Sequence, residues 1–247
     1  MTMAYLSRVR LRRDGALSAL GPLLMPDDPH ARTGTAHRLV WTLFADTADR
    51  RRDFLWREEG TGQAGFLVLS ARPPLDPHGL FEPLETKQWS PVLRAGDQLS
   101  FSLRANPVRR LRHDPERKGP GKTQRYHDVV MHALSSPADG AFAGSRSERR
   151  EVAIRSAGLA WLERQGETAV FTLLDPEASL RIDGYEQIRV PRGPASSPIR
   201  FSMLEFDGKL RVDDPSRFLR RLHAGFGKAR AWGCGLMLIR RARSNGR

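Results

Sequence analysis

A short stretch late in the chain, 225–239 (GFGKARAWGCGLMLI), contains four glycines and then becomes apolar. Glycine tolerates positive φ angles, so closely spaced glycines predict a loop whose backbone folds back tightly. The apolar run 236–239 is typical of a short buried strand, which would fix this loop to a sheet. We therefore expect a helix, a tight loop and a terminal strand in this order.

The same stretch suggests a phosphate contact. Backbone N–H groups gathered in a glycine loop bind phosphate when a cation lies beside them. The candidate residues are Gly225, Gly227, Lys228, Arg230, Gly233 and Gly235. An ordinary glycine-rich turn fits the same residues, and this pattern alone does not choose between the two.

Two nucleotide-binding motifs can be excluded here. A Walker A loop requires Ser or Thr after its lysine, but Ala229 follows Lys228. A dinucleotide fingerprint beginning at Gly225 would require a third glycine where Arg230 stands. A nucleotide-dependent enzyme is therefore disfavoured.

The charge of the chain indicates a polyanionic partner. Lys and Arg number 41 against 28 Asp and Glu, giving a net charge of +13 and a pI of about 11.1. Such an excess is typical of proteins that bind nucleic acid or an anionic membrane surface. Nucleic acid is the favoured partner, although a compositional preference for arginine would contribute to the same excess.

Other classes are excluded by what the sequence lacks. A single cysteine, Cys234, allows neither an intramolecular disulfide nor a cysteine-based zinc cluster. There is no apolar run long enough for a transmembrane helix and no signal-peptide core at the N-terminus. We expect no membrane association, no metal, no cofactor and a cytoplasmic location.

The first part of the chain has the pattern of a split βαβ unit. A strand over 4–12 alternates apolar residues with Arg8, Arg10 and Arg12. A helix capped by Asp28 follows. The remaining elements are strands at 52–58 and 65–70, a Pro-rich turn at 71–79, a short weak helix between this turn and 87–89, and a strand at 98–106. This order predicts a ferredoxin-like fold.

The second part repeats this pattern after a basic, Pro- and Gly-rich linker at 107–125 and an irregular insertion at 135–150. Its expected elements are a helix at 151–165, strands at 170–174, 180–190 and 199–206, a turn at Asp207-Gly208, a strand at 209–212, a helix opening at Asp214 or Pro215 and a strand at 236–239. The predicted fold is α+β, with two tandem ferredoxin-like (RRM-like) βαββαβ domains at 1–112 and 113–247.

His37 is the candidate catalytic residue. At 100° per residue, the apolar positions of the first helix form a buried stripe, and His37 lies at its edge. A ring placed there can contact the protein with one nitrogen and a ligand with the other, which suits an acid–base group. His30 lies two turns earlier on the same edge. A histidine that is merely packed fits this position equally well.

Arginines at exposed positions are the candidate RNA contacts. A basic hairpin around 190–200 would carry Arg189, Arg192 and Arg200, and thin β-hairpins can enter the deep groove of A-form RNA. The further candidates on strands and helices are Arg8, Arg10, Arg38 and Arg104, with the outward residues Arg217, Arg220 and Arg221 of the last helix.

Five segments together resemble one family. The glycine-rich stretch is similar to the C-terminal loop of the repeat-associated RNA-processing proteins of CRISPR systems. The segments 5–9 (YLSRV), 37–44 (HRLVWTLF), 52–55 (RDFL) and 101–107 (FSLRANP) resemble the CasE family of type I-E systems, in the order in which that family has them.

The resemblance implies a metal-independent endoribonuclease. It would bind the hairpin of the CRISPR repeat RNA, cut at the 3′ base of the stem to leave a 2′,3′-cyclic phosphate, and stay on the guide RNA with the other Cascade subunits. The family histidine corresponds to His37, whereas Gly34 stands where some members carry a tyrosine. The second catalytic group and the acid or base role of His37 therefore stay open. A non-catalytic RNA-binding module is the alternative, although the aromatic strand motif of a standard RNA-recognition domain is missing.

Overall fold

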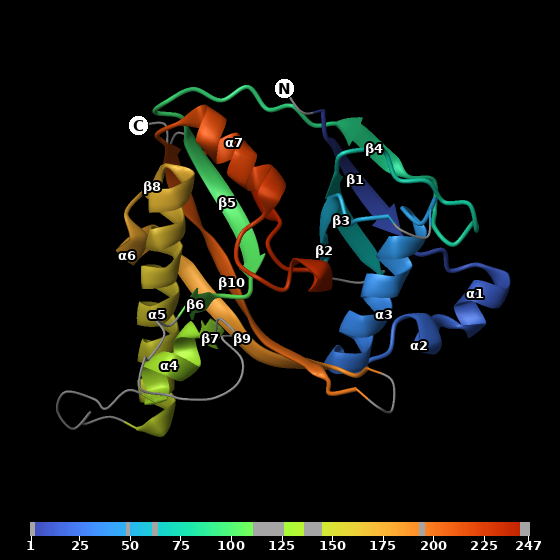
Figure 1. Cartoon of the computed structure of the whole chain (residues 1–247), viewed down its shortest axis with the longest axis horizontal. Coiled ribbons are helices and arrows are strands. Elements are labelled where there is room, and N and C mark those ends of the chain that lie inside the picture. Colours follow the sequence, from blue (N-terminus) through green and yellow to red (C-terminus); the bar gives the residue numbers. More distant parts are fainter. Residues whose placement is uncertain are drawn as a thin grey trace, which may run out of the picture.

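A computed structural model describes residues 3–47, 50–60, 64–110, 126–135, 145–192 and 196–242. The chain forms a mixed α+β structure in which two antiparallel sheets lie side by side (Figure 1). None of the helices in these ranges is long and apolar enough to cross a bilayer. The predicted α+β class is confirmed.

The first sheet has the order β2-β3-β1-β4, with every pair antiparallel. Its strands are β1 (Tyr5–Arg10), β2 (Phe54–Glu58), β3 (Gly65–Ser70) and β4 (Glu85–Gln88). Two short helices, α1 (Gly15–Ala19) and α2 (Gly21–Leu24), precede the long helix α3 (Pro29–Thr42). The helix α3 packs on one face of the sheet, where its apolar stripe meets side chains of β1, β2 and β3.

Helix α3 forms where the sequence predicts it. The Asp28 side chain accepts a hydrogen bond from Ala31 N at 2.7 Å, and Pro29 occupies the first turn. Pro lacks an N–H and therefore leaves no unsatisfied donor at that position. The expected stripe is buried in full; its residues are Ala36, Leu39, Val40, Leu43 and Phe44.

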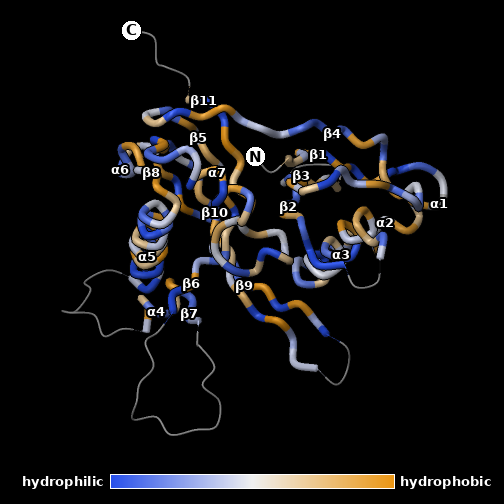
Figure 2. The backbone as a smooth tube through the Cα atoms, turned by 45° about the horizontal axis from the view of Figure 1, so that its top comes forward, coloured by the Kyte–Doolittle hydropathy of each residue, from blue (hydrophilic) through white to orange (hydrophobic). Residues whose placement is uncertain are grey.

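The second sheet has the order β11-β5-β10-β8, and β9 also pairs with β10. Its strands are β5 (Gln98–Ala105), β8 (Phe171–Leu173), β9 (Arg181–Val190), β10 (Ile199–Val212) and β11 (Met237–Arg241). The helices of this part are α4 (Val129–Ser135), α5 (Arg146–Ala169), α6 (Pro176–Ser179) and α7 (Pro215–Ala224). Apolar residues of β5, β10, α5 and α7 share one core. Figure 2, which colours the backbone by hydropathy, shows hydrophobic positions alternating with hydrophilic ones in this part of the chain.

One strand belongs to a different sheet from the one expected. The strand at 98–106 was assigned to the first unit by sequence order, but β5 pairs with β10 and β11 in the second sheet. Its buried residues Leu99, Phe101 and Leu103 join the second core. The chain passes from the first sheet to the second between Gln88, the end of β4, and Gln98, the start of β5. The predicted end of the first domain, residue 112, lies after this point.

Two local predictions are wrong. No helix forms within 71–84, and Glu85–Gln88 is a strand because it pairs with β1 at the edge of the sheet. Asp207 and Gly208 do not turn the chain either, because β10 runs through both and pairs with β5 there. A Cβ atom at Gly208 would lie 3.0 Å from Leu180 and 3.1 Å from Phe101, so this glycine permits close packing rather than a turn.

The connection after β5 is only partly described. The predicted linker at 107–125 begins with a short strand, β6 (Val108–Arg110), which pairs with β7 (Tyr126–Asp128). The rest of that linker, and the part of the 135–150 insertion at 136–144, lie outside the described residues. Helix α5 starts at Arg146, five residues before the predicted 151, with a capping box between Ser145 and Glu148.

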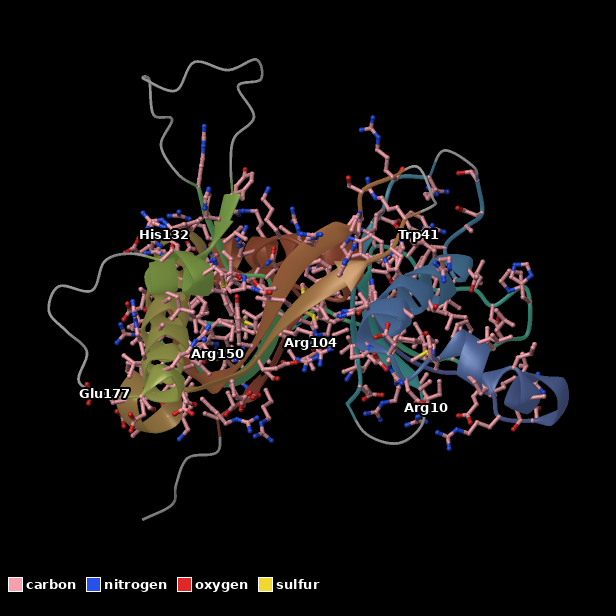
Figure 3. The ribbon with its side chains drawn as sticks, turned by 90° about the horizontal axis from the view of Figure 1, so that it is seen from below. Arg10, Trp41, Arg104, His132, Arg150 and Glu177 are labelled. Atoms are coloured by element: carbon pink, nitrogen blue, oxygen red, sulfur yellow. The ribbon has the colours of Figure 1, made fainter. Side chains whose placement is uncertain are left out.

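The facing surfaces of the two sheets form a seam of apolar and charged contacts. Ala4, Leu55 and Leu69 of the first part pack with Leu236 before β11. Beside them, Glu205 on β10 accepts from Arg104 on β5 at 2.5 Å and lies 3.5 Å from Arg57 on β2. Figure 3 shows Arg104 between the two halves of the molecule.

Truncating Leu236 tests the seam. Leu236 is 1% exposed, so Leu236→Ala is expected to lower the free energy of unfolding by about 2–5 kcal/mol, measured by urea denaturation. Val92 is 76% exposed, and Val92→Ala is the control, with an expected change within about 0.5 kcal/mol. Equal effects of the two substitutions would contradict a stabilising role for the seam.

Candidate functional site

The glycine-rich stretch is a tight loop between α7 and β11, as predicted. All four of its glycines have positive φ, between 69° and 91°. They also lie against other parts of the chain: a Cβ atom at Gly227 would be 2.6 Å from the Asn106 carbonyl oxygen, and one at Gly235 would be 2.7 Å from that of Phe226. At Gly227 and Gly235 a side chain is therefore disfavoured by both conformation and space.

Several amides of the loop bind the protein itself. Five of its N–H groups donate to backbone carbonyls: those of Gly225, Phe226, Lys228, Trp232 and Gly235. These amides are thus not free to bind phosphate, in contrast to the expectation for the backbone of Gly225 and Gly235. The exposed Lys228 side chain remains a candidate contact, with its Nζ 4.3 Å from the centre of the Tyr126 ring.

The part of the loop that meets helix α3 is a 3-10 turn, η1 (Arg230–Trp232). The Ala231 carbonyl oxygen in this turn lies 2.8 Å from His37 Nδ1 and accepts a hydrogen bond from Trp56 Nε1 at 3.0 Å. The Trp232 ring lies 4.4 Å from the His37 ring, and Trp41, one helical turn along α3, approaches it edge-on at 6.3 Å. His37 and Ala231 are 194 positions apart in the chain.

This contact defines the tautomer of His37. A carbonyl oxygen only accepts hydrogen bonds, so Nδ1 must carry the hydrogen and donate it. In the neutral ring, Nε2 then holds the free electron pair. His37 is half-buried, so its Nδ1 is fixed by the protein while Nε2 is the nitrogen left for a ligand.

The surroundings also favour the neutral ring. Burial is the main cause that lowers the pKa of His37 below its ordinary value of 6.5. The hydrogen bond to Ala231 opposes this shift, whereas the positive charges of Arg52 and Arg38 lower the pKa further. At neutral pH the geometry therefore presents an unprotonated Nε2.

The arginines around His37 differ in what they contact. Arg38, the next residue after His37, is exposed and donates to Thr35 Oγ1 at 3.0 Å. It has no acidic partner among the residues that the structure describes. Arg230 donates to the Ala224 carbonyl within the loop. Arg52, which the sequence prediction did not select, is partly buried next to this group. Its only sequence signal is its place in the RDFL segment at 52–55.

The basic hairpin forms from β9 and β10 and lies against α3. Arg189 and Arg200 are opposite each other in its ladder, and both are exposed, as is Arg192. Like charges on directly paired positions destabilise a hairpin unless an anion lies between them. Figure 1 shows that the hairpin extends beneath α3. These three arginines are therefore close to the helix that carries His37.

Two residues explain the close approach of α3 to this hairpin. A Cβ atom at Gly34 would lie 3.2 Å from Val190 Cγ1, so a large side chain at position 34 would not fit. His30 Nδ1 accepts a hydrogen bond from the Arg189 backbone N–H at 3.3 Å. His30 thus supports the hairpin, and it is not in contact with His37.

Three predicted RNA contacts already have acidic partners. Arg8 pairs with Glu59 and Arg10 pairs with Glu85, each at 2.7 Å on the first sheet. Arg104 is held by Glu205 in the seam. Figure 3 shows Arg10 on the first sheet, separated from Arg104 at the middle of the molecule. These three arginines therefore already pair with carboxylates of the protein itself.

Helix α7 differs in one respect from the prediction. Arg217 and Arg220 are exposed as expected. Arg221 is half-buried and donates to Gln165 Oε1 of α5 at 2.6 Å, with its guanidinium 5.1 Å from the Phe226 ring centre. Its role in the structure is therefore to link α7 with α5.

Comparison with known proteins gives consistent matches over most of the chain. A family model described as CRISPR associated protein matches residues 4–241. The chain is 29% identical over 202 residues to the CRISPR-associated endoribonuclease Cse3 of Thermus thermophilus, covering 76% of this chain and 80% of the relative. It is 27% identical over 208 residues to the CRISPR system Cascade subunit CasE of Escherichia coli, covering 82% and 89%.

A solved structure shares this fold. The structure of Thermus thermophilus Cse3 bound to an RNA representing a pre-cleavage complex has a TM-score of 0.64 at 23% identity. The match covers 96% of this chain and 99% of that chain. The mixed α+β architecture with two antiparallel sheets is thus that of Cse3.

Substitution of a loop glycine tests how strictly the loop is built. Gly235→Ala is expected to lower the free energy of unfolding by about 2–4 kcal/mol, because φ is +91° and the new methyl group would meet the Phe226 backbone. Gly21→Ala is the matched control, since nothing lies within 4 Å of a Cβ there. Thermal unfolding measures both, and equal midpoints would show that the loop tolerates a side chain.

Proposed function

The chain belongs to the family of CRISPR-associated proteins, in its Cse3/CasE branch, and on this premise we propose that it is a metal-independent endoribonuclease. It binds the hairpin of the CRISPR repeat RNA and cuts precursor CRISPR RNA at the 3′ base of the stem. The observation that carries the proposal is the fixed His37 ring, whose Nε2 faces away from the Ala231 contact beside a basic hairpin.

The reaction proceeds by transfer within the RNA. The 2′-oxygen attacks the adjacent phosphorus, the bond from phosphorus to the 5′-oxygen breaks, and a 2′,3′-cyclic phosphate and a 5′-OH are formed. The 2′-OH loses one proton, and the departing 5′-oxygen gains one from water. Because the nucleophile belongs to the substrate, the protein has to align it, move a proton and stabilise added negative charge.

His37 acts as the general base in this scheme. Its Nδ1–H is held by Ala231, which leaves Nε2 to accept the 2′-OH proton. The lowered pKa keeps the ring unprotonated at neutral pH, as a base requires. Proton transfer of this kind contributes typically about 10²- to 10⁴-fold to a rate.

RNA binding is assigned to the basic hairpin. A-form RNA is recognised by its shape, phosphates and 2′-OH groups, and its deep groove admits only thin elements. The paired Arg189 and Arg200, with Arg192 beyond them, place positive charge along such an element. Arg38 and Lys228 extend this charge toward His37 and the loop, so a stem on the hairpin would bring its base to the histidine.

We interpret the two sheets as two ferredoxin-like units. The order β2-β3-β1-β4 is the strand order 2-3-1-4 of a βαββαβ unit without its second helix. The second unit starts at β5, with α5 and α7 as its helices, and has the equivalent order when β9 is counted as its second strand. We place the boundary between Gln88 and Gln98.

The protein also keeps its RNA product in this proposal. The Escherichia coli relative is named a Cascade subunit. By analogy, this chain remains on the mature guide RNA and joins the other Cascade subunits through it. A protein that keeps its product would act once per RNA, so single-turnover measurements are the appropriate assay.

Cleavage in EDTA tests the proposed activity. The wild-type protein is expected to cut the cognate repeat in EDTA, and His37→Ala to lower the single-turnover rate by about 10²-fold or more. Mass analysis of the product should give a terminal cyclic phosphate. Binding without cleavage by the wild type would instead indicate a non-catalytic RNA-binding module, and full activity of His37→Ala would exclude the histidine.

The pH dependence of the rate tests the base role. A base must be unprotonated, so the rate is expected to rise with pH through a pKa below 6.5 and to level off above about pH 7. A group acting as an acid would give a rate that falls over the same range. Single-turnover rates between pH 4.5 and pH 8, chosen to bracket this range, distinguish the two.

Charge reversal on the hairpin tests RNA binding. Arg192→Glu is expected to weaken binding of the repeat about tenfold or more and to leave the thermal midpoint unchanged, because the side chain is exposed. Arg164→Glu on the exposed side of α5 is the control with the same change of charge. Similar losses for both variants, measured by filter binding at a fixed salt concentration, would remove the hairpin from the interface.

A further inference from the structure

Arg52 has a buried hydrogen-bond donor that no other group in the described part of the site satisfies. Its Nη1 atom is buried and has no hydrogen-bond partner within the described part of the chain. An unsatisfied buried donor on a charged group is costly, and such groups in folded proteins normally have a partner or a function. A partner for this guanidinium is therefore to be sought outside the chain.

Arg52 lies beside the proposed catalytic group. It immediately precedes β2, and the Asp53 carbonyl already accepts from Ala71 N, so the ladder with β3 reaches this point. Two residues further on, Phe54 packs against Trp41, whose ring approaches His37. The charge of Arg52 also acts on His37, where it lowers the pKa of the ring.

No carboxylate in the described part of the chain pairs with Arg52. The neighbouring carboxylate of Asp53 binds Arg72 at 3.0 Å, and within the described residues Arg52 forms no ion pair. The positive charge of Arg230 acts on Arg52 and, after burial, lowers its pKa further. A partly buried guanidinium that lacks an acidic partner and feels a second positive charge would be stabilised by an anion.

The other nearby cations fit this role less well. Arg38 is exposed and bound to Thr35, and Arg230 is bound to the Ala224 carbonyl. The Lys228 ammonium lies over the Tyr126 ring. Arg52 is thus the cation beside His37 that combines burial with a free donor.

We propose that Arg52 is the second catalytic residue and that its guanidinium binds the non-bridging oxygens of the scissile phosphate. This inference rests on the proposed RNA cleavage. It identifies the second catalytic group that acts with His37, which the sequence left open. The phosphate gains negative charge as the 2′-oxygen adds, and a planar guanidinium can bind two of its oxygens at once. Arg52 transfers no proton in this scheme, because arginine stays protonated at neutral pH.

Substitution by methionine, with a neighbour as control, tests the inference. Arg52→Met removes the charge and keeps most of the side-chain length, and Arg51→Met makes the same change at an exposed site one residue away. We expect Arg52→Met to lower the single-turnover rate on the repeat about 10²- to 10³-fold, with Kd changed less than about threefold. Arg51→Met should retain the wild-type rate within about threefold.

A second readout separates catalysis from a structural role. Loss of the Arg52 charge should raise the pKa that governs the acid limb of the rate profile, because this charge lowers the pKa of His37. Arg52→Lys keeps the charge but cannot bind two oxygens in the same way, so it should leave the acid limb in place and still lower the rate about tenfold or more. If Arg52→Met does not fold, the single-turnover rate of Arg52→Lys tests the catalytic role of Arg52 in its place.

The outcomes are distinct. A wild-type protein that does not cut the repeat would refute the proposed function itself. An active wild type with unchanged rates in Arg52→Met, or in Arg52→Lys where Arg52→Met does not fold, would overturn the role of Arg52. A loss of rate with an unmoved acid limb in Arg52→Met, together with a lower thermal midpoint, would also overturn it, since Arg52 would then only stabilise the fold.

Discussion

The carbonyl oxygen of Ala231 is the contact on which the candidate site depends. It accepts hydrogen bonds from His37 Nδ1 on α3 and from the Trp56 indole on β2. The carbonyl itself lies in a loop from the second half of the chain. The direction of this one acceptor fixes the histidine tautomer and therefore the nitrogen that faces a ligand. The glycine-rich loop thus contributes to the site mainly by orienting His37, and less through its own amides.

The rigidity of the loop follows from its packing. Gly225 and Gly233 lie against Leu55 and Trp56 of β2, and Gly227 lies against the end of β5. A loop held on both sheets can place the Ala231 oxygen reproducibly, whereas a mobile loop would give the histidine several orientations. The seam between the sheets serves the same purpose, because it fixes the first half relative to the second.

The arginines fall into two groups that differ in their partners. Those in the sheets and the seam are matched by carboxylates, as Arg104 is by Glu205. Arg189, Arg192 and Arg200, toward the tip of the hairpin, form no ion pair with the described residues, and Arg189 and Arg200 lie opposite each other. Arg38, which follows His37 on α3, also lacks an acidic partner among the described residues. This separation explains how a chain of net charge +13 folds while it keeps one surface for a polyanion.

The sequence by itself determined most of the local elements, the positive φ angles of the loop glycines and the buried stripe of α3, because capping, glycine conformation and apolar period act between near neighbours. Only the tertiary structure decided the sheet to which β5 belongs and the continuous course of β10 through Gly208, since strand pairing joins distant segments. The meeting of His37 with Ala231, and the lack of a partner for Arg52, were decided in the same way. A periodicity records which residues are buried, but it does not record which distant atoms meet.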